Sequence, residues 1–358
     1  MSAPPQHPYR SQPTRAFWSR AVAAGFEAAD LPATAQPLLR PGDRVVSAGS
    51  CFASNMIGWL EGSGLVYVRT EQPHPAFAHL PENLGYRSFS AAYGNVYTAR
   101  HLRQLLERAS GELHPVEDRW HEQGRVIDPF RPGLRYPASS DAEFDALTAQ
   151  HLRAVLEAFA AATVFVFTLG LTEGWESTFD GAVYPACPGT VAGRFDAARH
   201  RFHNFSAEEV RADLVAFIRR LREINPGVRA ILTVSPVPLV ATATDQHVVV
   251  ASSYSKAVLR VAAAEAAASE PDVTYFPALE IVTGPQAPHD HLAEDRRSVT
   301  EAGVSAVMET LLAASDLPER PAAAALAPTP APAPELSPSM DLSRRIAEAD
   351  CDEVLVEG

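Results

Sequence analysis

A short apolar stretch in the middle of the chain limits the possible folds more than any other feature. Residues 163–169 read Thr-Val-Phe-Val-Phe-Thr-Leu, a nearly continuous run of β-branched and aromatic side chains. A strand with one solvated face alternates apolar and polar residues, whereas a strand covered by helices on both faces does not have to. The run therefore predicts a buried strand in a parallel sheet, and parallel strands require long crossover connections, usually helices.

Predicted helices alternate with predicted strands along the chain. The five expected strands are residues 44–48, 65–68, 163–169, 229–234 and 273–276. Apolar residues at helical spacing predict helices at 98–108, 142–162, 206–224 and 251–268, and another directly after the first strand. This alternation predicts a three-layer α/β fold with a parallel sheet. If the strand order is flavodoxin-like, a crevice opens between the ends of the first and third strands.

The same pattern divides the chain into four parts. We expect a flexible N-terminal arm, one α/β domain, a Pro/Ala-rich linker and an acidic tail, at residues 1–15, 16–316, 317–340 and 341–358. The linker lacks the apolar density that folding requires. The tail is interpreted either as a short amphipathic helix that docks on a protein partner or as a frayed end.

Two further expectations concern segments inside the domain. A helix is predicted at its start, over residues 16–29. A long loop is predicted at about 71–90, a surface excursion or a small hairpin insert at 117–137, and a loop-rich insert at 175–205. Within the last insert, His200 and His203 are either metal ligands or, more commonly for such spacing, loop histidines.

The first strand runs into Gly49-Ser50-Cys51, and helical periodicity follows. A strand that turns sharply into a helix exposes the turn side chain beside the free N–H groups of the helix N-terminus. That position suits a nucleophile next to a developing negative charge, and it lowers the pKa of a thiol. The residues alone equally fit a plain turn, with Gly49 bending the chain, Ser50 capping the helix and Cys51 buried as a small apolar residue.

Residues 49–53 spell Gly-Ser-Cys-Phe-Ala, the motif for which the GSCFA-domain family is named, and the chain resembles that family, itself similar to the SGNH/GDSL hydrolases. Further matching blocks occur in order at residues 8–10, 16–18, 93–98, 168–175, 233–238 and 254–256. The resemblance implies an esterase-like hydrolase or an acyltransferase that acts on an ester or thioester. The alternative is a non-hydrolytic α/β protein that binds a small molecule or glycan in the same crevice.

The resemblance also implies which atom attacks. In the SGNH motif Gly-Asp-Ser the nucleophile is the third residue, and this position corresponds to Cys51, with Ser50 capping the helix or donating a hydrogen bond. A thiolate is the better nucleophile, and near a helix N-terminus it is partly ionised at neutral pH. We therefore expect Cys51 to attack, and Ser50 is the alternative nucleophile.

Two other blocks are implied to bind the oxyanion or the substrate. One contains Gly94 and Asn95, and the other contains Gly170, Thr172, Glu173 and Trp175. The general SGNH pattern at the second block is Gly-x-Asn-Asp, so Thr172 and Glu173 depart from it. An ionised Glu173 cannot donate a hydrogen bond. It is expected to accept one from a histidine, to hold a substrate hydroxyl, or to be an exposed loop carboxylate.

The general base is the weak part of the resemblance. SGNH enzymes carry Asp-x-x-His just before the final helix, but residues 293–300 here read Ala-Glu-Asp-Arg-Arg-Ser-Val-Thr, with Ser298 at the histidine position. His291 and then His247 are the preferred candidates for the base. Glu280 or Asp295 is expected to orient it.

Composition limits the classes of partner and the cellular location that we expect for the protein. The formal net charge is −13, which argues against a nucleic-acid partner and against an anionic membrane surface. Three widely separated cysteines suggest neither a disulfide framework nor a metal site, so a reducing cytoplasm is expected and no cofactor is. No stretch is long and apolar enough to span a bilayer. The expected substrate is a small-molecule or glycan acyl compound.

Overall fold

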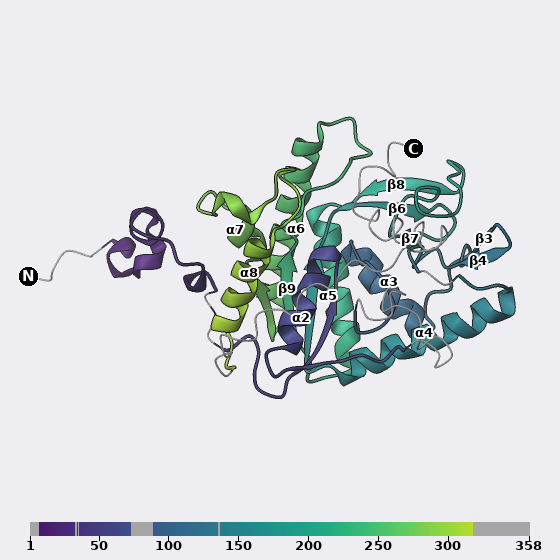
Figure 1. Cartoon of the computed structure of the whole chain (residues 1–358), viewed down its shortest axis with the longest axis horizontal. Coiled ribbons are helices and arrows are strands. Elements are labelled where there is room, and N and C mark those ends of the chain that lie inside the picture. The colour runs from purple at the N-terminus through teal and green to yellow at the C-terminus, as the bar shows by residue number, and fades with distance from the viewer. Residues whose placement is uncertain (1–6, 33, 35, 73–88, 135–136, 318–358) are drawn as a thin grey trace, which may run out of the picture.

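The computed structural model describes residues 7–32, 34, 36–72, 89–134 and 137–317 (Figure 1). The predicted acidic tail, most of the linker and residues 73–88 of the first insert lie outside the described residues. The domain boundaries at residues 16 and 316 stay a prediction.

The fold is a mixed α/β structure whose central sheet has five parallel strands flanked by helices. The strand order is β10-β9-β5-β1-β2, which is the flavodoxin-like order, so the predicted fold class is confirmed. The strands are β1 (Arg44–Ala48), β2 (Val66–Tyr67), β5 (Val164–Leu169), β9 (Arg229–Val234) and β10 (Val273–Phe276).

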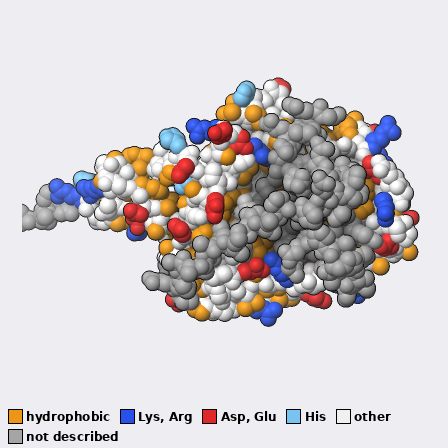
Figure 2. All heavy atoms as spheres, in the orientation of Figure 1, with side chains coloured by type: hydrophobic (Ala, Val, Ile, Leu, Met, Phe, Trp, Pro, Cys, Tyr) orange, Lys and Arg blue, Asp and Glu red, His pale blue; other side chains and the backbone are white. Residues whose placement is uncertain are grey.

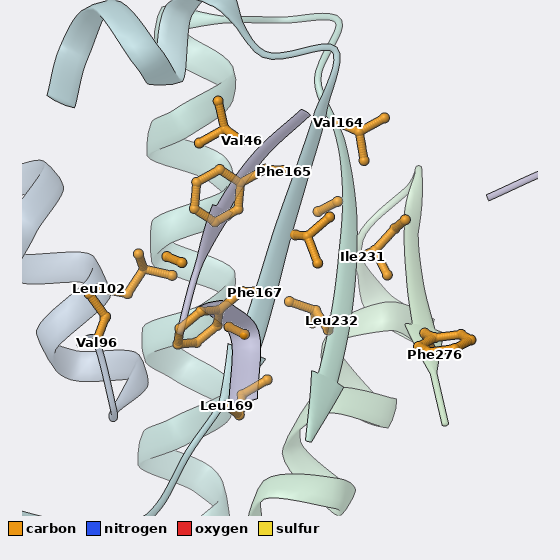
Figure 3. Close-up of a cluster of buried hydrophobic side chains, with 14 of the residues drawn as sticks. Val46, Val96, Leu102, Val164, Phe165, Phe167, Leu169, Ile231, Leu232 and Phe276 are labelled. Carbon is orange, nitrogen blue, oxygen red and sulfur yellow. The ribbon is translucent and has the colours of Figure 1, made fainter. Parts of the chain in front are cut away.

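The apolar run forms β5, the middle strand, and every one of its residues is buried. Phe165 and Phe167 project from one side of this strand and Val164 from the other (Figure 3). Phe165 meets Phe159 edge to face, with ring centroids 5.1 Å apart, and Phe217 at 5.0 Å. Burial on both faces explains why this strand shows no alternation of polar residues.

Helices cover both faces of the sheet. α2 and α8 pack together beside β1 and β5, and α3 to α6 form the opposite layer (Figure 1). Side-chain caps start several of them: Ser206 and Glu209 form a reciprocal capping box on α5. The helices are α2 (Cys51–Glu61), α3 (Ala99–Ala109), α4 (Asp141–Ala161), α5 (Ala207–Ile224), α6 (Val248–Ser269), α7 (Ala278–Thr283) and α8 (Glu301–Ala313).

The second insert contains a small hairpin, which is one of its two predicted forms, and the third insert is more ordered than the sequence predicts. The hairpin of β3 (Trp120–Glu122) and β4 (Arg125–Ile127) lies in the second insert, and an antiparallel sheet in the order β7-β6-β8 replaces the predicted loops of the third. Its strands are β6 (Glu173–Ser177), β7 (Val183–Tyr184) and β8 (His200–Asn204). Glu176 of β6 is buried and paired with Arg201 and His203 of β8. These strands carry charged and polar residues, including the buried Glu176, so they lack the apolar alternation that indicates a strand.

The predicted helix at residues 16–29 is wrong. The structure has only the short helix α1 (Trp18–Ala21) there, between the 3-10 turns η2 (Thr14–Ala16) and η3 (Ala28–Asp30). None of the residues in these three elements is buried. Because most helical stability comes from packing an apolar face, helical spacing without a partner surface does not produce a long helix.

Candidate active site

A glycine shapes the turn after β1. Gly49 has a φ of 154°, and a Cβ there would lie 2.8 Å from the Cβ of Ala53 and 2.9 Å from both the Cβ and the carbonyl oxygen of Thr168. Real Cβ atoms do not approach that closely. Glycine at this position therefore lets the first turn of α2 pack directly against the end of β5.

Ser50 and Cys51 lie where the strand becomes the helix. Ser50 is buried at the N-cap of α2, but its side chain makes no capping hydrogen bond, so the predicted capping role is wrong. Its carbonyl oxygen instead accepts from the backbone N–H of Ala53 at 2.8 Å. Cys51 is the first residue of α2, and its side chain lies outside the described part of the structure.

The Gly94 to Tyr97 loop joins the ends of the two central strands. The N–H of Val96 donates to the carbonyl of Gly49 at 2.8 Å, and the N–H groups of Gly170 and Leu171 donate to the carbonyl of Tyr97 at 3.0 and 3.2 Å. Three loops thus meet at the carboxyl ends of β1 and β5, as the strand order predicts. In this junction the Asn95 side-chain amide donates to the Tyr97 hydroxyl at 3.0 Å.

The loop after β5 is held from α6. Lys256 Nζ donates to the carbonyl of Gly170 at 2.7 Å, and the N–H of Thr172 donates to Ser255 Oγ at 3.0 Å. Thr172 is fully buried and donates its hydroxyl to Asn204 Oδ1 at 2.7 Å. The sequence marked Ser255 and Lys256 only as part of a matching block, and their positioning role becomes visible once α6 is placed beside this loop.

The side chains of Glu173 and Trp175 connect the site to the loop after β9 and to the third insert. Glu173 accepts from Thr242 Oγ1 at 2.6 Å and from the N–H of Ala243 at 3.0 Å, so its carboxylate ties β6 to the loop after β9. Trp175 packs edge to face against Phe195 and Phe202, with ring centroids 5.4 and 5.6 Å away. These contacts make Trp175 part of the insert's own packing.

The two candidate bases occupy different sides of the sheet. His291 is buried beside α8, and its Nδ1 lies 3.2 Å from the carbonyl of Ile281. Because a carbonyl only accepts, Nδ1 carries the proton in this hydrogen bond, and Nε2 of the neutral ring is left to accept. His247 is the N-cap of α6, and its Nδ1 already accepts from the N–H of Val249 at 3.2 Å.

Neither expected carboxylate is hydrogen-bonded to these histidines. Glu280 accepts from Arg260 at 2.6 Å and from the Tyr275 hydroxyl at 2.8 Å. Asp295 accepts from the hydroxyl of Ser298 at 2.6 Å and from its N–H at 2.9 Å. A backbone carbonyl orients His291 instead, a partner that sequence patterns do not reveal.

The Asp-x-x-Ser segment is thus a complete hydrogen-bonded turn. The hydroxyl of Ser298 is the largest influence on Asp295, and together with the backbone N–H groups of Arg297 and Ser298 it lowers the pKa of that carboxyl group. The turn lies on a hairpin in which the N–H of Ala293 donates to the carbonyl of Ser298 at 2.8 Å. Serine therefore occupies the place where the resemblance expects an imidazole.

Behind the Gly94 loop lies a buried polar cluster that the sequence did not predict. Glu71 Oε2 accepts from the N–H of Ala92 and from His151 Nδ1, each at 2.7 Å, and Arg131 donates to the carbonyl of Ala92 at 3.3 Å. Arg131 Nε also donates to Asp128 at 2.8 Å. All four side chains are buried. Both backbone groups of Ala92, two residues before Gly94, are thus fixed by this cluster.

The cluster holds its carboxylates ionised. Burial raises the pKa of Glu71, but the hydrogen bond and charge of His151, the charge of Arg131 and the N–H of Ala92 outweigh it, so the pKa is lowered. The pKa of Asp128 is lowered in the same way, against its burial, by Arg131 and Arg108. Burial lowers the pKa of His151. Glu71 is therefore an ionised acceptor for the N–H of Ala92 and for His151.

His200 and His203 pair with different carboxylates. His200 Nε2 lies 3.0 Å from Glu117, while His203 lies 3.1 Å from Glu176 and 2.9 Å from Glu209. Within the described ranges, no group of three or more His, Cys, Asp or Glu residues is arranged to hold a metal ion. No helix in the described part of the chain has the length and apolar character needed to cross a bilayer.

Comparison with known proteins gives a family match. The family model described as GSCFA family matches residues 44–311, from the start of β1 to the last turn of α8. No curated protein matches the chain.

Two solved structures resemble the chain weakly. One is an acetyl esterase mutant with an acetate ion, with a TM-score of 0.32, 10% identity, and coverage of 75% of this chain and 93% of that chain. The other is a carbohydrate esterase family 3 protein from Talaromyces cellulolyticus, with a TM-score of 0.34, 10% identity, and coverage of 75% and 94%. At these TM-scores neither structure bears on the chemistry of this chain.

Proposed function

The chain belongs to the GSCFA family, and from that premise we propose that it is an SGNH-like hydrolase or acyltransferase with Cys51 as its nucleophile. The observation that carries this proposal is the junction of three loops at the ends of β1 and β5. The Gly-Ser-Cys turn lies there, and the Val96 to Gly49 hydrogen bond of 2.8 Å ties the Gly94 loop to it. An ester or a thioester is the proposed substrate.

The proposed reaction has two steps. The Cys51 sulfur attacks the acyl carbonyl, a C–S bond forms, and the C–O or C–S bond to the leaving group breaks. Nε2 of His291 takes the thiol proton and gives it to the leaving group. Water or an acceptor hydroxyl then attacks the thioester, and its proton passes to Nε2 of His291 and on to the Cys51 sulfur. A C–O bond forms and the C–S bond to Cys51 breaks. Backbone N–H groups at the start of α2 and at Gly94 stabilise the oxyanion in both steps.

Charge supports a small substrate. The net charge is −13, and on the face shown in Figure 2 the Lys and Arg side chains are scattered among acidic and apolar ones. This distribution favours a small-molecule or glycan acyl compound over nucleic acid or an anionic membrane. We also propose a cytoplasmic location, which the odd number of widely spaced cysteines supports.

The test is ester turnover by the full chain. A series of p-nitrophenyl esters of increasing acyl length should give catalytic turnover that Cys51→Ala removes. Cys187→Ala is the matched control, because burial raises the pKa of the Cys187 thiol to about 11 and leaves it unreactive at neutral pH. Equal turnover by Cys51→Ala and the wild type would contradict a cysteine nucleophile.

One observation favours the second candidate function, a binding protein without hydrolytic activity. Ser298 stands at the expected histidine position, and its hydroxyl is bonded to Asp295 at 2.6 Å. A serine cannot serve as the general base. In this case no ester in the series would turn over, and a glycan or small molecule would still bind in the crevice, measurable by calorimetry.

A further inference from the structure

Helix α6 carries an exposed apolar stripe. Val250, Tyr254 and Val261 are 55%, 46% and 48% exposed, and they belong to the few large hydrophobic side chains exposed in the described part of the chain. Ala257, Ala264 and Ala268 continue the same line. The spacing of 4, 3, 4, 3 and 4 residues puts all six on one narrow face of the helix.

The opposite face of α6 is already occupied. Its buried residues, among them Val258, Leu259 and Ala262, pack toward β9, β10 and α5 (Figure 1). An exposed apolar face on a helix is a candidate interaction surface. The stripe therefore faces away from the fold and has no partner among the described residues.

The order of side-chain sizes identifies the partner. The six positions are symmetric about residue 259: 250 with 268, 254 with 264, and 257 with 261. Each of these pairs joins one large residue and one alanine: Val250 with Ala268, Tyr254 with Ala264, and Val261 with Ala257. If two copies of α6 pack antiparallel around a two-fold axis at residue 259, every large side chain lies opposite a small one.

The charges on the helix fit the same arrangement. α6 has three charged residues, Lys256, Arg260 and Glu265. A parallel pair would set Glu265 against Glu265 and Tyr254 against Tyr254, which the antiparallel pair avoids. Arg260, next to the axis, is paired with Glu280 of its own chain at 2.6 Å, so it brings no uncompensated charge to the contact.

We propose that the chain forms a two-fold symmetric dimer through antiparallel packing of α6 against α6 of a second copy. A single helix stripe buries less than the roughly 800 Å² per partner of a standard interface, so we expect a dimer with a Kd of about micromolar order. This inference does not rest on the proposed function. Dimerisation would stabilise the candidate site, because Ser255 and Lys256 of the same helix hold the loop after β5.

Sedimentation velocity of the full chain, from about 1 to about 200 µM, tests the proposal. We expect a concentration-dependent dimer whose Kd rises at least about tenfold in Val261→Glu, because two carboxylates would be buried near the axis. Val116→Glu is the matched control, because Val116 is 69% exposed and lies in the loop before β3. This control should leave the Kd unchanged.

A size swap tests the register. Ala257→Val sets two valines opposite each other and should weaken the dimer, whereas Ala257→Val combined with Val261→Ala restores one large and one small residue per pair and should recover it. A chain that stays monomeric at all concentrations would overturn the proposal. So would a dimer that survives Val261→Glu, a swap no better than the single change, or a dimer lost only when residues 318–358 are deleted.

Discussion

The two halves of the candidate site are built very differently. On the nucleophile side, the turn at Gly49 is fixed by close packing on Thr168, and the neighbouring Gly94 loop is anchored by the buried Glu71 cluster. On the base side, the Asp295 to Ser298 turn is exposed and hydrogen-bonded mainly within itself. Close packing and buried polar contacts thus fix the turn at Gly49, whereas Ser298 stands where the resemblance expects a histidine. If Cys51 is the nucleophile, as we propose, a thiol tolerates the absence of that histidine better than a hydroxyl does.

The largest expected effect comes from weakening the nucleophile. Cys51→Ser should lower kcat/KM for a p-nitrophenyl ester by at least about a hundredfold, because a serine hydroxyl needs a strong base for activation. Ser50→Ala should lower it by less than about threefold. If Ser50→Ala removes activity and Cys51→Ser does not, Ser50 is the nucleophile and the alignment of the motif is wrong.

The anchoring of the nucleophile side is tested by stability. Glu71→Gln should lower the free energy of unfolding by about 3 kcal/mol at pH 7, because it removes the negative partner of a buried cluster. The matched control Glu301→Gln, at an exposed position in the first turn of α8, should change it little. Urea unfolding followed by circular dichroism measures both.

The sign of the pH dependence follows from the lowered pKa of Glu71. Its carboxylate stabilises the fold above its ordinary pKa of 4.5, and this stabilisation is lost as the pH falls through the lower pKa of the folded state. The difference between wild type and Glu71→Gln should therefore shrink below pH 4.5. A difference that grows on acidification would contradict an ionised Glu71.

Substitution of His291 tests whether this residue acts as the general base. His291→Gln should lower kcat/KM by about tenfold, less than is usual for a general base, because a thiol near a helix N-terminus is already partly ionised. The loss should become smaller as the pH is raised. His247→Gln, which changes the N-cap of α6, serves as the comparison and should leave the pH profile unshifted.

The smallest effect on the wild type is expected from restoring a histidine at position 298. Ser298→His should raise kcat/KM of the wild type only several-fold but that of Cys51→Ser by about tenfold or more, because only the hydroxyl depends on an added base. Ser298→Ala should have almost no effect. Equal gains in both backgrounds would mean that base strength does not distinguish the two nucleophiles.

Much of the fold could be predicted from the sequence. The apolar run at 163–169 and the helical spacing around it predicted the parallel sheet, because a strand that is buried on both faces is a continuous apolar run in the sequence. Alternation alone does not set the strand order, but the flavodoxin-like order considered for it is the one observed, and it brings the loops at Gly49 and Gly170 together. The antiparallel insert could not be predicted in the same way, since its strands carry charged residues such as the buried Glu176, which pairs with the exposed Arg201.

Prediction of the site from the sequence has the same limit. The motif located the Gly-Ser-Cys turn, but the partners of the side chains depend on contacts between distant segments. Glu71 and Arg131 meet at Ala92, and His291 finds the carbonyl of Ile281. A backbone carbonyl or amide can be supplied by any residue, so no residue type marks it in advance.

The most direct test of a cysteine nucleophile is to locate the acyl group. The full chain carrying Cys351→Ser is mixed with p-nitrophenyl acetate at pH 7, quenched in acid and digested for peptide mass spectrometry. We expect one acetyl group on Cys51, removed by neutral hydroxylamine as a thioester is, with Cys187 unmodified. An acetyl group on Ser50 would contradict the account, and so would turnover of the ester with no acyl group on either residue.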